Sequence, residues 1–359
     1  MDIWVFNEQF EFIRLVDVYE SFIWNEKYIG YGDFELYMYA SYDLIMDLRQ
    51  NYYLKIADSD QVMIIEDIEI SNDIEKGSKI KFSGRSLESI LDRRIIWKKT
   101  TLDGSLQVGI KKLIDENIIS PEPDENGRSR KIENFIFEDS TDPAITDLTL
   151  TAQYTGDNIY EVINKICETC GIGFRVRLNS NNQFVFSLYK GIDRSYAQTI
   201  NSYVVFSSEF DNIINTDYFE SQKEYKNVTL VLGEDKDEER KRRAVGNAVG
   251  LARRELYTDA RDIQSEKGEG ETYTDDEYNA MLDQRGYEKL IEKVEAKAFE
   301  GNIEPNGIYV YKKDFFKGDI VQIVGNFGIQ FRVRIDEIIR SVDENGFEVY
   351  PTFKVMEES

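Results

Sequence analysis

The chain has 359 residues, an apolar fraction of 41% and a formal net charge of −24. The length exceeds one ordinary core and the apolar content argues against global disorder, so we expect about two to four packed domains. The charge argues against sequence-specific binding of nucleic acid, which relies on Lys and Arg displacing phosphate counterions. No apolar run approaches the roughly 18 residues that a membrane helix needs.

Residues 1–97 predict a small β-barrel or sandwich. Strand-like segments are rich in aromatic and β-branched residues or alternate apolar with polar positions. They cover residues 4–6, 10–13, 22–24, 34–39, 53–56, 62–70 and 79–84. Gly30, Gly32 and Asp33 mark a turn, and residues 42–50 fit one short helix. Short strands at this spacing are typical of a barrel or sandwich.

Residues 98–202 predict an α+β domain. Helical patterns cover 105–119 and 158–170, the second with Asp157 as its expected N-cap and Gly171 as its C-cap. Strand-like sequence follows at 135–137 and 148–150, and 174–178 with 183–188 predict a hairpin across 179–182.

Residues 203–235 and 305–359 predict a second barrel, interrupted by residues 236–304. Its strand-like segments are 203–206, 227–232, 308–311, 319–324 and 329–335, followed by a hairpin of 337–342 with 346–350. The charged run 234–243 and the polar stretch 259–276 predict a long solvated loop, and 276–299 predict a helix. The predicted fold class is therefore α+β, mainly β.

The chain contains no histidine. Its absence removes the most common general base, the Ser–His and Cys–His nucleophile pairs and the most common zinc ligand. Carboxylate chemistry survives this test because Asp and Glu number 68, but no acidic pair stands out. We therefore predict no catalytic residue, no metal site and no cofactor.

Cys167 and Cys170 form a CxxC pair, which can be a redox dithiol or half of a zinc site. A zinc site needs further Cys or His ligands, and the sequence has none. A thioredoxin-type pair starts a helix, whereas this pair ends a helical pattern before Gly171. Two ordinary thiols at a helix end are the favoured interpretation.

Three groups of segments, taken in order, carry a resemblance. The first joins 19–24 (YESFIW) with 31–36 (YGDFEL), and the second, the most specific, is 83–94 (SGRSLESILDRR). The third joins 316–321 (FKGDIV), 334–338 (RIDEI) and 351–353 (PTF). This order resembles the hub family of long-tailed phages, the Gp37-like or tail-associated-lysin N-terminal proteins, which are related to contractile-tail baseplate hubs. The likeness in layout covers nearly the whole chain.

The residues of these motifs suggest structural roles. Gly84 ends a strand before a helix and is expected in a geometry that is costly for other residues. Arg85, Arg93 and Arg94 are expected to bridge carboxylates, either between subunits or within one. Gly318 with Asp319 predicts the turn that starts a strand.

The resemblance implies a ring. Family hubs are trimers with two related β-barrel domains per subunit, so that six barrels match the sixfold tail tube. On that plan residues 1–97 form the first hub domain, and 203–235 with 305–359 form the second. The α+β domain of 98–202 and the charged loop and long helix of 236–304 would pack outside the ring.

The implied role is mechanical, in a virion tail made in the host cytoplasm. The ring would close the distal end of the tail tube and open for DNA passage. Its expected partners are two further copies of the chain, the distal tail protein, the tape-measure protein and a fibre, spike or lysin. Because the sequence ends at Ser359, just after the last predicted strand, we expect no attached hydrolase. A tail-like bacteriocin or injection particle could use the same part.

Two other classes of function stay open. A receptor- or carbohydrate-binding tail module would use exposed aromatic residues. Aromatic residues make up 13% of the whole chain, so the sequence leaves room for such a module. A carboxylate glycosidase would need two acids about 5–9.5 Å apart in a cleft.

Overall fold

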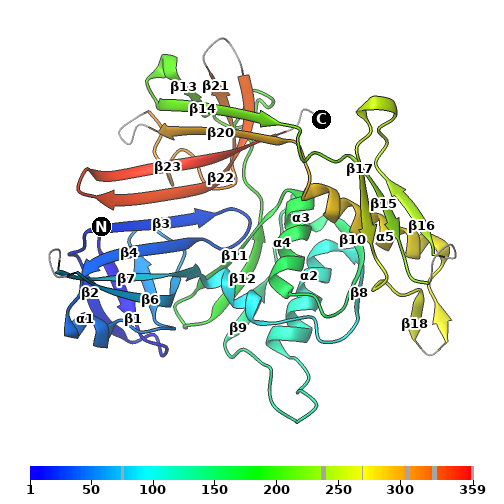
Figure 1. The fold of residues 1–359 in the computed structure, drawn as a ribbon, viewed down its shortest axis with the longest axis horizontal. Helices are drawn as coiled ribbons and strands as arrows, with labels where there is room; N and C mark the ends of the chain where they lie inside the picture. The colour runs from blue at the N-terminus through cyan, green and yellow to red at the C-terminus, as the bar shows by residue number, and fades with distance from the viewer. Residues whose placement is uncertain (74–76, 236–239, 269, 304–307, 326–329, 357–359) are drawn as a thin grey trace. The chain divides into compact units, whose positions relative to one another are not determined.

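The computed structural model describes residues 1–359 except 74–76, 236–239, 269, 304–307, 326–329 and 357–359. At 214–217, 268 and 296–303 it describes the backbone alone. The chain divides into two compact units (Figure 1). Unit 1 comprises Met1–Ile90, Gly173–Tyr218 and Ala298–Ser359, and unit 2 comprises Leu91–Ile172 and Phe219–Lys297.

Unit 1 begins with a block of seven strands and one short helix, here called the N-terminal block. Its elements are β1 (Ile3–Phe6), β2 (Phe12–Val16), β3 (Ser21–Lys27), β4 (Asp33–Tyr39), α1 (Tyr42–Asp47), β5 (Tyr53–Ile56), β6 (Met63–Asp73) and β7 (Gly77–Ser86). All neighbouring pairs in this block are antiparallel. In β4 every second side chain is buried, as the alternation in the sequence predicts.

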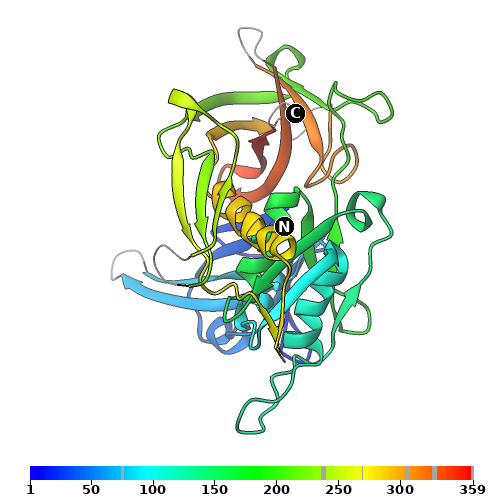
Figure 2. The same ribbon diagram turned by 90° about the vertical axis from the view of Figure 1, so that its right-hand side faces the viewer.

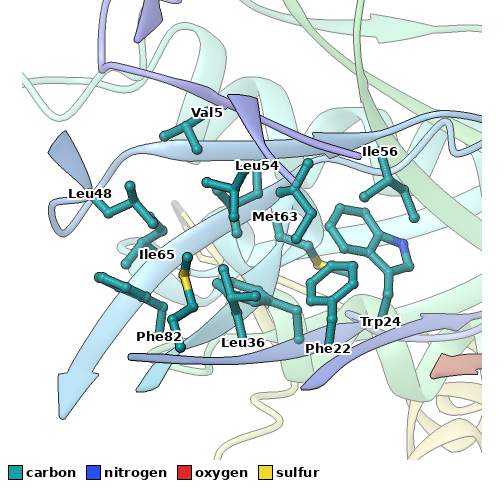
Figure 3. Close-up of a cluster of buried hydrophobic side chains, with 14 of the residues drawn as sticks. Val5, Phe22, Trp24, Leu36, Leu48, Leu54, Ile56, Met63, Ile65 and Phe82 are labelled. Carbon is teal, nitrogen blue, oxygen red and sulfur yellow. The ribbon is translucent and has the colours of Figure 1, made fainter. Parts of the chain in front are cut away.

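One hydrophobic core fills the N-terminal block (Figure 3). Phe22 and Trp24 of β3 point into it together with Leu54, Met63 and Phe82, and all five side chains are fully buried. The alternation of apolar residues along each strand places these side chains on one face of the sheet, and burying that face stabilises the block.

A second group of strands in unit 1 comes from the later parts of the chain and is here called the C-terminal block. It contains β13 (Val205–Ser207), the short 3-10 turn Ser208–Phe210, β14 (Ile213–Ser221), β20 (Ala296–Ile303), β21 (Ile320–Val324), β22 (Gln330–Asp343) and β23 (Gly346–Val355). Its own core gathers around Phe206, Val321, Val333 and Ile335. The hairpin of β11 (Gly173–Leu178) and β12 (Phe184–Tyr189) also belongs to unit 1 and has the predicted antiparallel pairing.

The long strand β22 joins the two blocks by changing its partner. Its first residues pair with β21, from Gln330 to Arg334, and its later residues pair with β3, from Glu337 to Val342. A bulge between Ile335 and Glu337, seen in the ladder with β23, lies where the partner changes. Bulges bend a strand and increase its twist, which allows one strand to serve two sheets. The result is one 13-stranded sheet whose main path runs β14-β20-β23-β22-β3-β4-β7-β6-β5-β1-β2 (Figure 1).

The mainly β fold class is confirmed, but no sheet formed by the described residues closes on itself. The path through the 13-stranded sheet is open, and its end strands β2 and β14 do not pair with each other. Strand β22 supplies the reason, because it continues into the ladder of the N-terminal block instead of turning back into its own.

Unit 2 contains the helices of the middle of the chain. Its first part has β8 (Thr100–Ser105), α2 (Leu106–Ile114), a π-helical turn (Asp115–Ile119), β9 (Phe135–Glu138), α3 (Pro143–Thr146), β10 (Thr149–Tyr154) and α4 (Ile159–Cys170). The 3-10 segment Leu87–Arg93 leads into it. The predicted helix of 158–170 is confirmed, as is Gly171 at its end in a left-handed conformation with φ 63°. Asn158, not Asp157, caps its start, because the Asn158 side chain accepts the amide of Glu161 while Asp157 accepts that of Thr155.

The second part of unit 2 corrects the prediction of a long solvated loop. The charged stretch contains β16 (Arg242–Val245), the 3-10 turn Gly250–Ala252, β17 (Glu255–Asp259), β18 (Glu266–Gly268) and β19 (Glu271–Thr272). The predicted strand of 227–232 is β15 (Val228–Leu232), and it pairs with β16 and β17 in unit 2 and not with the C-terminal block. Single apolar residues, among them Val245, Ala260 and Ile263, pack with α5 (Asp275–Ile291) into a small core, and Figure 2 shows α5 along the three-stranded sheet. The prediction failed because these apolar residues stand alone between charges and form no periodic pattern.

The predicted helix of 276–299 is confirmed at its start and is too long at its end. It begins at Asp275, where Thr274 and Glu277 form a reciprocal capping box. It ends at Ile291, and Ala296–Ile303 forms β20 instead. Pairing of β20 with β23 outweighs helix propensity in this segment. None of the helices among the described residues is long and apolar enough to cross a membrane.

Candidate functional site

The junction of β3 and β22 contains a buried ion pair. The Glu26 carboxylate of β3 and the Arg340 guanidinium of β22 lie 3.0 Å apart, and their side chains are 3% and 6% exposed. In the ladder Glu26 faces Ile338 and Arg340 faces Trp24, so the two charges are diagonal neighbours on one face. Ser59 donates a hydrogen bond of 2.8 Å to Glu26, and Tyr311 donates one of 3.1 Å.

The charge balance around Glu26 keeps it ionised. Burial alone would raise the pKa of this carboxyl, but Lys317, Arg340 and Lys312 together outweigh burial and hold the pKa below its usual value. The Arg340 guanidinium also donates to the Asp58 carbonyl oxygen at 3.2 Å. The junction is therefore fixed by a fully satisfied buried carboxylate, a feature that specifies one strand register.

The turn at Gly318 and Asp319 has the predicted place, directly before β21. Gly318 has φ +93°, a conformation that other residues rarely adopt. The Asp319 carboxylate is 2% exposed and accepts the backbone amides of Ile192 and Phe316 and the side chain of Arg194. It thus ties the segment after β12 to the start of β21.

Tyr28 is enclosed next to this turn. A Cβ built on Gly318 would lie 2.3 Å from the Tyr28 ring, and one built on Gly173 would lie 2.5 Å from it. The ring packs edge-on against Tyr189, with centroids 5.2 Å apart, and beneath the guanidinium of Arg334. Both glycines are therefore needed so that three distant parts of unit 1 can meet around one aromatic ring.

Two of the three motif arginines, Arg85 and Arg94, have partners of different kinds. Arg85 pairs within the chain, with two hydrogen bonds of 2.7 and 2.9 Å to Glu66. Arg94 donates to the carbonyl oxygens of Arg130 and Arg93, and among the described residues it forms no ion pair with a carboxylate. Of the two alternatives for Arg85, the structure therefore shows the one within a subunit.

Gly84 occupies a position without room for a side chain. A Cβ there would lie 1.9 Å from the Ile64 carbonyl oxygen of the neighbouring strand β6. Any other residue at position 84 would be strained, as expected. The cause of the strain is the close approach of β6 at the bulge between Ile65 and Asp67, and not an unusual φ angle of Gly84.

Cys167 and Cys170 lie at the end of α4 and form no disulfide. Cys167 is buried, and burial raises the pKa of its thiol well above the usual value, with smaller contributions from Cys170 and Glu168. A raised pKa opposes the thiolate that redox and metal chemistry require. Within the described ranges, no group of three or more Cys, Asp or Glu side chains is placed to hold a metal ion.

The sequence alone does not single out Glu26 and Arg340, the charged residues at the junction of β3 and β22. Glu26 follows Trp24 and Asn25, and all three are buried. A charged residue inside an aromatic strand is a signal for a buried partner, but the partner Arg340 lies far along the chain. Asp319 was recognised as part of a turn, and its three acceptor contacts were not foreseen.

Comparison with known families explains this architecture. The model of the siphovirus ReqiPepy6 Gp37-like proteins matches residues 2–353. The chain belongs to this family. The expected resemblance is thus confirmed over nearly the whole sequence. A search of curated proteins found no match.

Solved structures of tail proteins have a similar fold. A tail protein from Neisseria meningitidis MC58 has a TM-score of 0.58 at 12% identity, covering 99% of this chain and 96% of that one. The 43 kDa tail protein of prophage MuSo2 from Shewanella oneidensis has a TM-score of 0.58 at 13% identity, covering 99% and 98%. Prophage tail protein gp18 from Listeria monocytogenes EGD-e has a TM-score of 0.56 at 13% identity, covering 100% and 96%. At these identities the likeness concerns the fold.

Proposed function

We propose that the chain is the hub of a phage tail or a phage-tail-like particle, and that three copies form a ring closing the distal end of the tail tube. The observation that carries this proposal is the single 13-stranded sheet with an open edge at each end. Each copy contributes two strand blocks with separate cores, and on this proposal the two blocks serve as its two hub domains.

The open edges are suited to pairing between copies. Among the described strands, β2 pairs with β1 alone and β14 pairs with β20 alone. Phe12 and Leu15 on β2 are 57% and 40% exposed, and Tyr218 on β14 is 41% exposed. Unprotected edges with exposed apolar side chains are templates for pairing with another chain. Unlike edges that meet head to tail generate a closed ring when the rotation between copies is a simple fraction of a turn.

The remaining parts of the proposal concern partners and action. The ring would contact the distal tail protein and the tape-measure protein and would hold a fibre, spike or lysin. It would open for DNA passage, and a net charge of −24 would keep DNA from adhering to the hub. The chain would act mechanically, as a component of the virion tail, without catalysing a reaction.

Light scattering on the purified protein tests the ring. We expect a mass about three times the chain mass of 41.9 kDa, and class averages in the electron microscope with a central hole. A monomer that persists when the purified distal tail protein is added would contradict the proposal. Incubation with cell-wall polymer is expected to release no soluble sugar or peptide, and measurable turnover would contradict the mechanical role.

A further inference from the structure

Unit 1 contains a cavity of about 320 Å³ whose lining is unusually basic. Its walls come from both strand blocks and from the hairpin of β11 and β12. The basic side chains are those of Arg175, Arg177, Lys190, Lys312 and Lys317, against four carboxylates. In the whole chain acidic residues outnumber basic ones by 68 to 44, so the cavity reverses the general balance.

Three of the four carboxylates are already engaged. Glu26 is held by Arg340, Tyr311 and Ser59, and Asp319 by Arg194 and two backbone amides. Glu88 is held by the Ser86 hydroxyl and the Val176 amide, and the fourth carboxylate, Asp60, is exposed.

Glu88 is fully buried and accepts hydrogen bonds from the Ser86 hydroxyl at 2.5 Å and the Val176 amide at 3.0 Å. Burial raises the pKa of this carboxyl, and the attraction of Lys317 and its two hydrogen bonds offset burial only in part.

Two polar groups in the wall are left without a direct partner. Within the described part of the chain, no carboxylate lies within 4.0 Å of the Lys317 ammonium. Burial lowers the pKa of the Lys317 ammonium below its usual value. The carboxylates of Glu26 and Glu88 act in the opposite direction, and the cations Lys312 and Arg175 lower this pKa further. Gln61 is only 4% exposed, and neither the nitrogen nor the oxygen of its side-chain amide has a hydrogen-bond partner among the described residues.

We propose that this cavity binds one small oxyanion, a carboxylate or phosphate group, with Lys317 supplying the charge and the Gln61 amide a hydrogen bond. An oxyanion satisfies both groups at once, because each of its oxygens accepts hydrogen bonds from ammonium and amide donors. The cavity volume suits a small molecule or a single acidic group.

Thermal unfolding tests the site, with sodium phosphate and sodium acetate titrated at a constant ionic strength set by sodium chloride. We expect a Tm that rises and saturates with at least one of the two anions. The substitution Lys317→Met is expected to abolish the saturable rise, and Lys317→Arg to keep it. Lys223→Met, at an exposed lysine outside the cavity, is the matched control and should respond like the original chain.

A second variant covers the case in which Lys317→Met fails to fold. Gln61→Met keeps the size of the side chain and removes the amide that has no partner, so it is expected to fold and to bind the anion about tenfold more weakly. Saturation with phosphate alone identifies a phosphate site, and saturation with acetate alone identifies a carboxylate site. A Tm that rises linearly and equally in the original chain and in Gln61→Met reports general salt exclusion and overturns the proposal.

Discussion

Glu26 and Arg340 are diagonal neighbours across the only ladder through which the described strands of the N-terminal and C-terminal blocks are hydrogen-bonded. Because the two charges attract each other, the pair favours the register of β3 and β22 in which they lie side by side. A shift of one strand by one residue would place the two side chains on opposite faces of the sheet and break the ion pair. The pair therefore selects one way in which the two blocks join.

The first prediction concerns the stability of this junction. Arg340→Met leaves the Glu26 carboxylate buried without its guanidinium partner, and we expect a loss of about 3–5 kcal/mol in the free energy of unfolding. In the double variant Glu26→Met with Arg340→Met, part of that loss should be recovered, because neither member of the ion pair is left buried without the other. Urea unfolding of both variants gives the comparison. Lys98→Ala, which removes an exposed ion pair with Glu122, is the control, with an expected loss below about 1 kcal/mol.

The prediction fails if Arg340→Met costs no more than Lys98→Ala. In that case the two blocks would be joined by their backbone ladder and apolar cores alone, and the buried pair would contribute nothing to stability.

A second prediction compares two glycines. Gly84→Ala places a methyl group 1.9 Å from the Ile64 carbonyl oxygen, which cannot move without breaking the ladder, and we expect destabilisation by about 1–3 kcal/mol or more. Gly109→Ala in α2 meets only the Leu102 side chain, at 3.4 Å, and should stabilise the helix by up to about 1 kcal/mol. Urea unfolding of the two variants checks both signs. An equal effect at the two positions would mean that close packing does not explain Gly84.

The sequence was sufficient for elements with a regular local pattern. The helices at Leu106–Ile114 and Ile159–Cys170 and the hairpin of β11 and β12 follow from helical spacing, caps and a polar turn. These signals act over a few residues, so they can be recognised without knowing the rest of the fold.

Contacts between distant segments could not be predicted in the same way. The change of partner along β22 depends on a bulge and on a match with β3, and neither has a local signature. Strand β15 was predicted, but β16, β17 and their pairing with β15 were not, because the buried residues of this sheet are isolated among charges. In both cases tertiary pairing decides the structure, and local propensity is too weak a guide.

A third prediction rests on the proposed ring. Phe12 is exposed on the edge strand β2, so Phe12→Lys should leave the fold of the monomer unchanged. If β2 pairs with another copy, a lysine at this edge opposes that pairing, and we expect the trimer to dissociate at least about tenfold more readily. Sedimentation velocity over a range of concentrations measures the effect. Val108→Lys adds the same charge to an exposed position of α2 and should assemble normally; equal dissociation of both variants would exclude β2 as the interface.

The last prediction concerns pH and the Glu288 carboxyl on α5. This side chain is 3% exposed and accepts hydrogen bonds from the Tyr154 hydroxyl and the Gln284 amide, while Arg285 lies 3.7 Å away and pairs mainly with Asp262. Burial raises its pKa above the ordinary 4.5, and Tyr154, Gln284 and Arg285 offset burial only in part.

The sign of the effect follows from proton binding. Between pH 4.5 and the raised pKa of Glu288, the folded chain binds more protons at this site than the unfolded chain, so this group makes stability fall as pH rises through that window. Glu288→Gln keeps an oxygen that accepts both hydrogen bonds and cannot ionise. We therefore expect the variant to match the original chain near pH 4.5 and to be more stable at neutral pH. Urea unfolding of both proteins at several pH values measures the difference, in which the titration of all other groups cancels. A variant whose disadvantage grows as pH rises would show instead that the Glu288 charge is stabilising where it lies, and a difference that does not change with pH would show that ionisation of Glu288 does not affect stability.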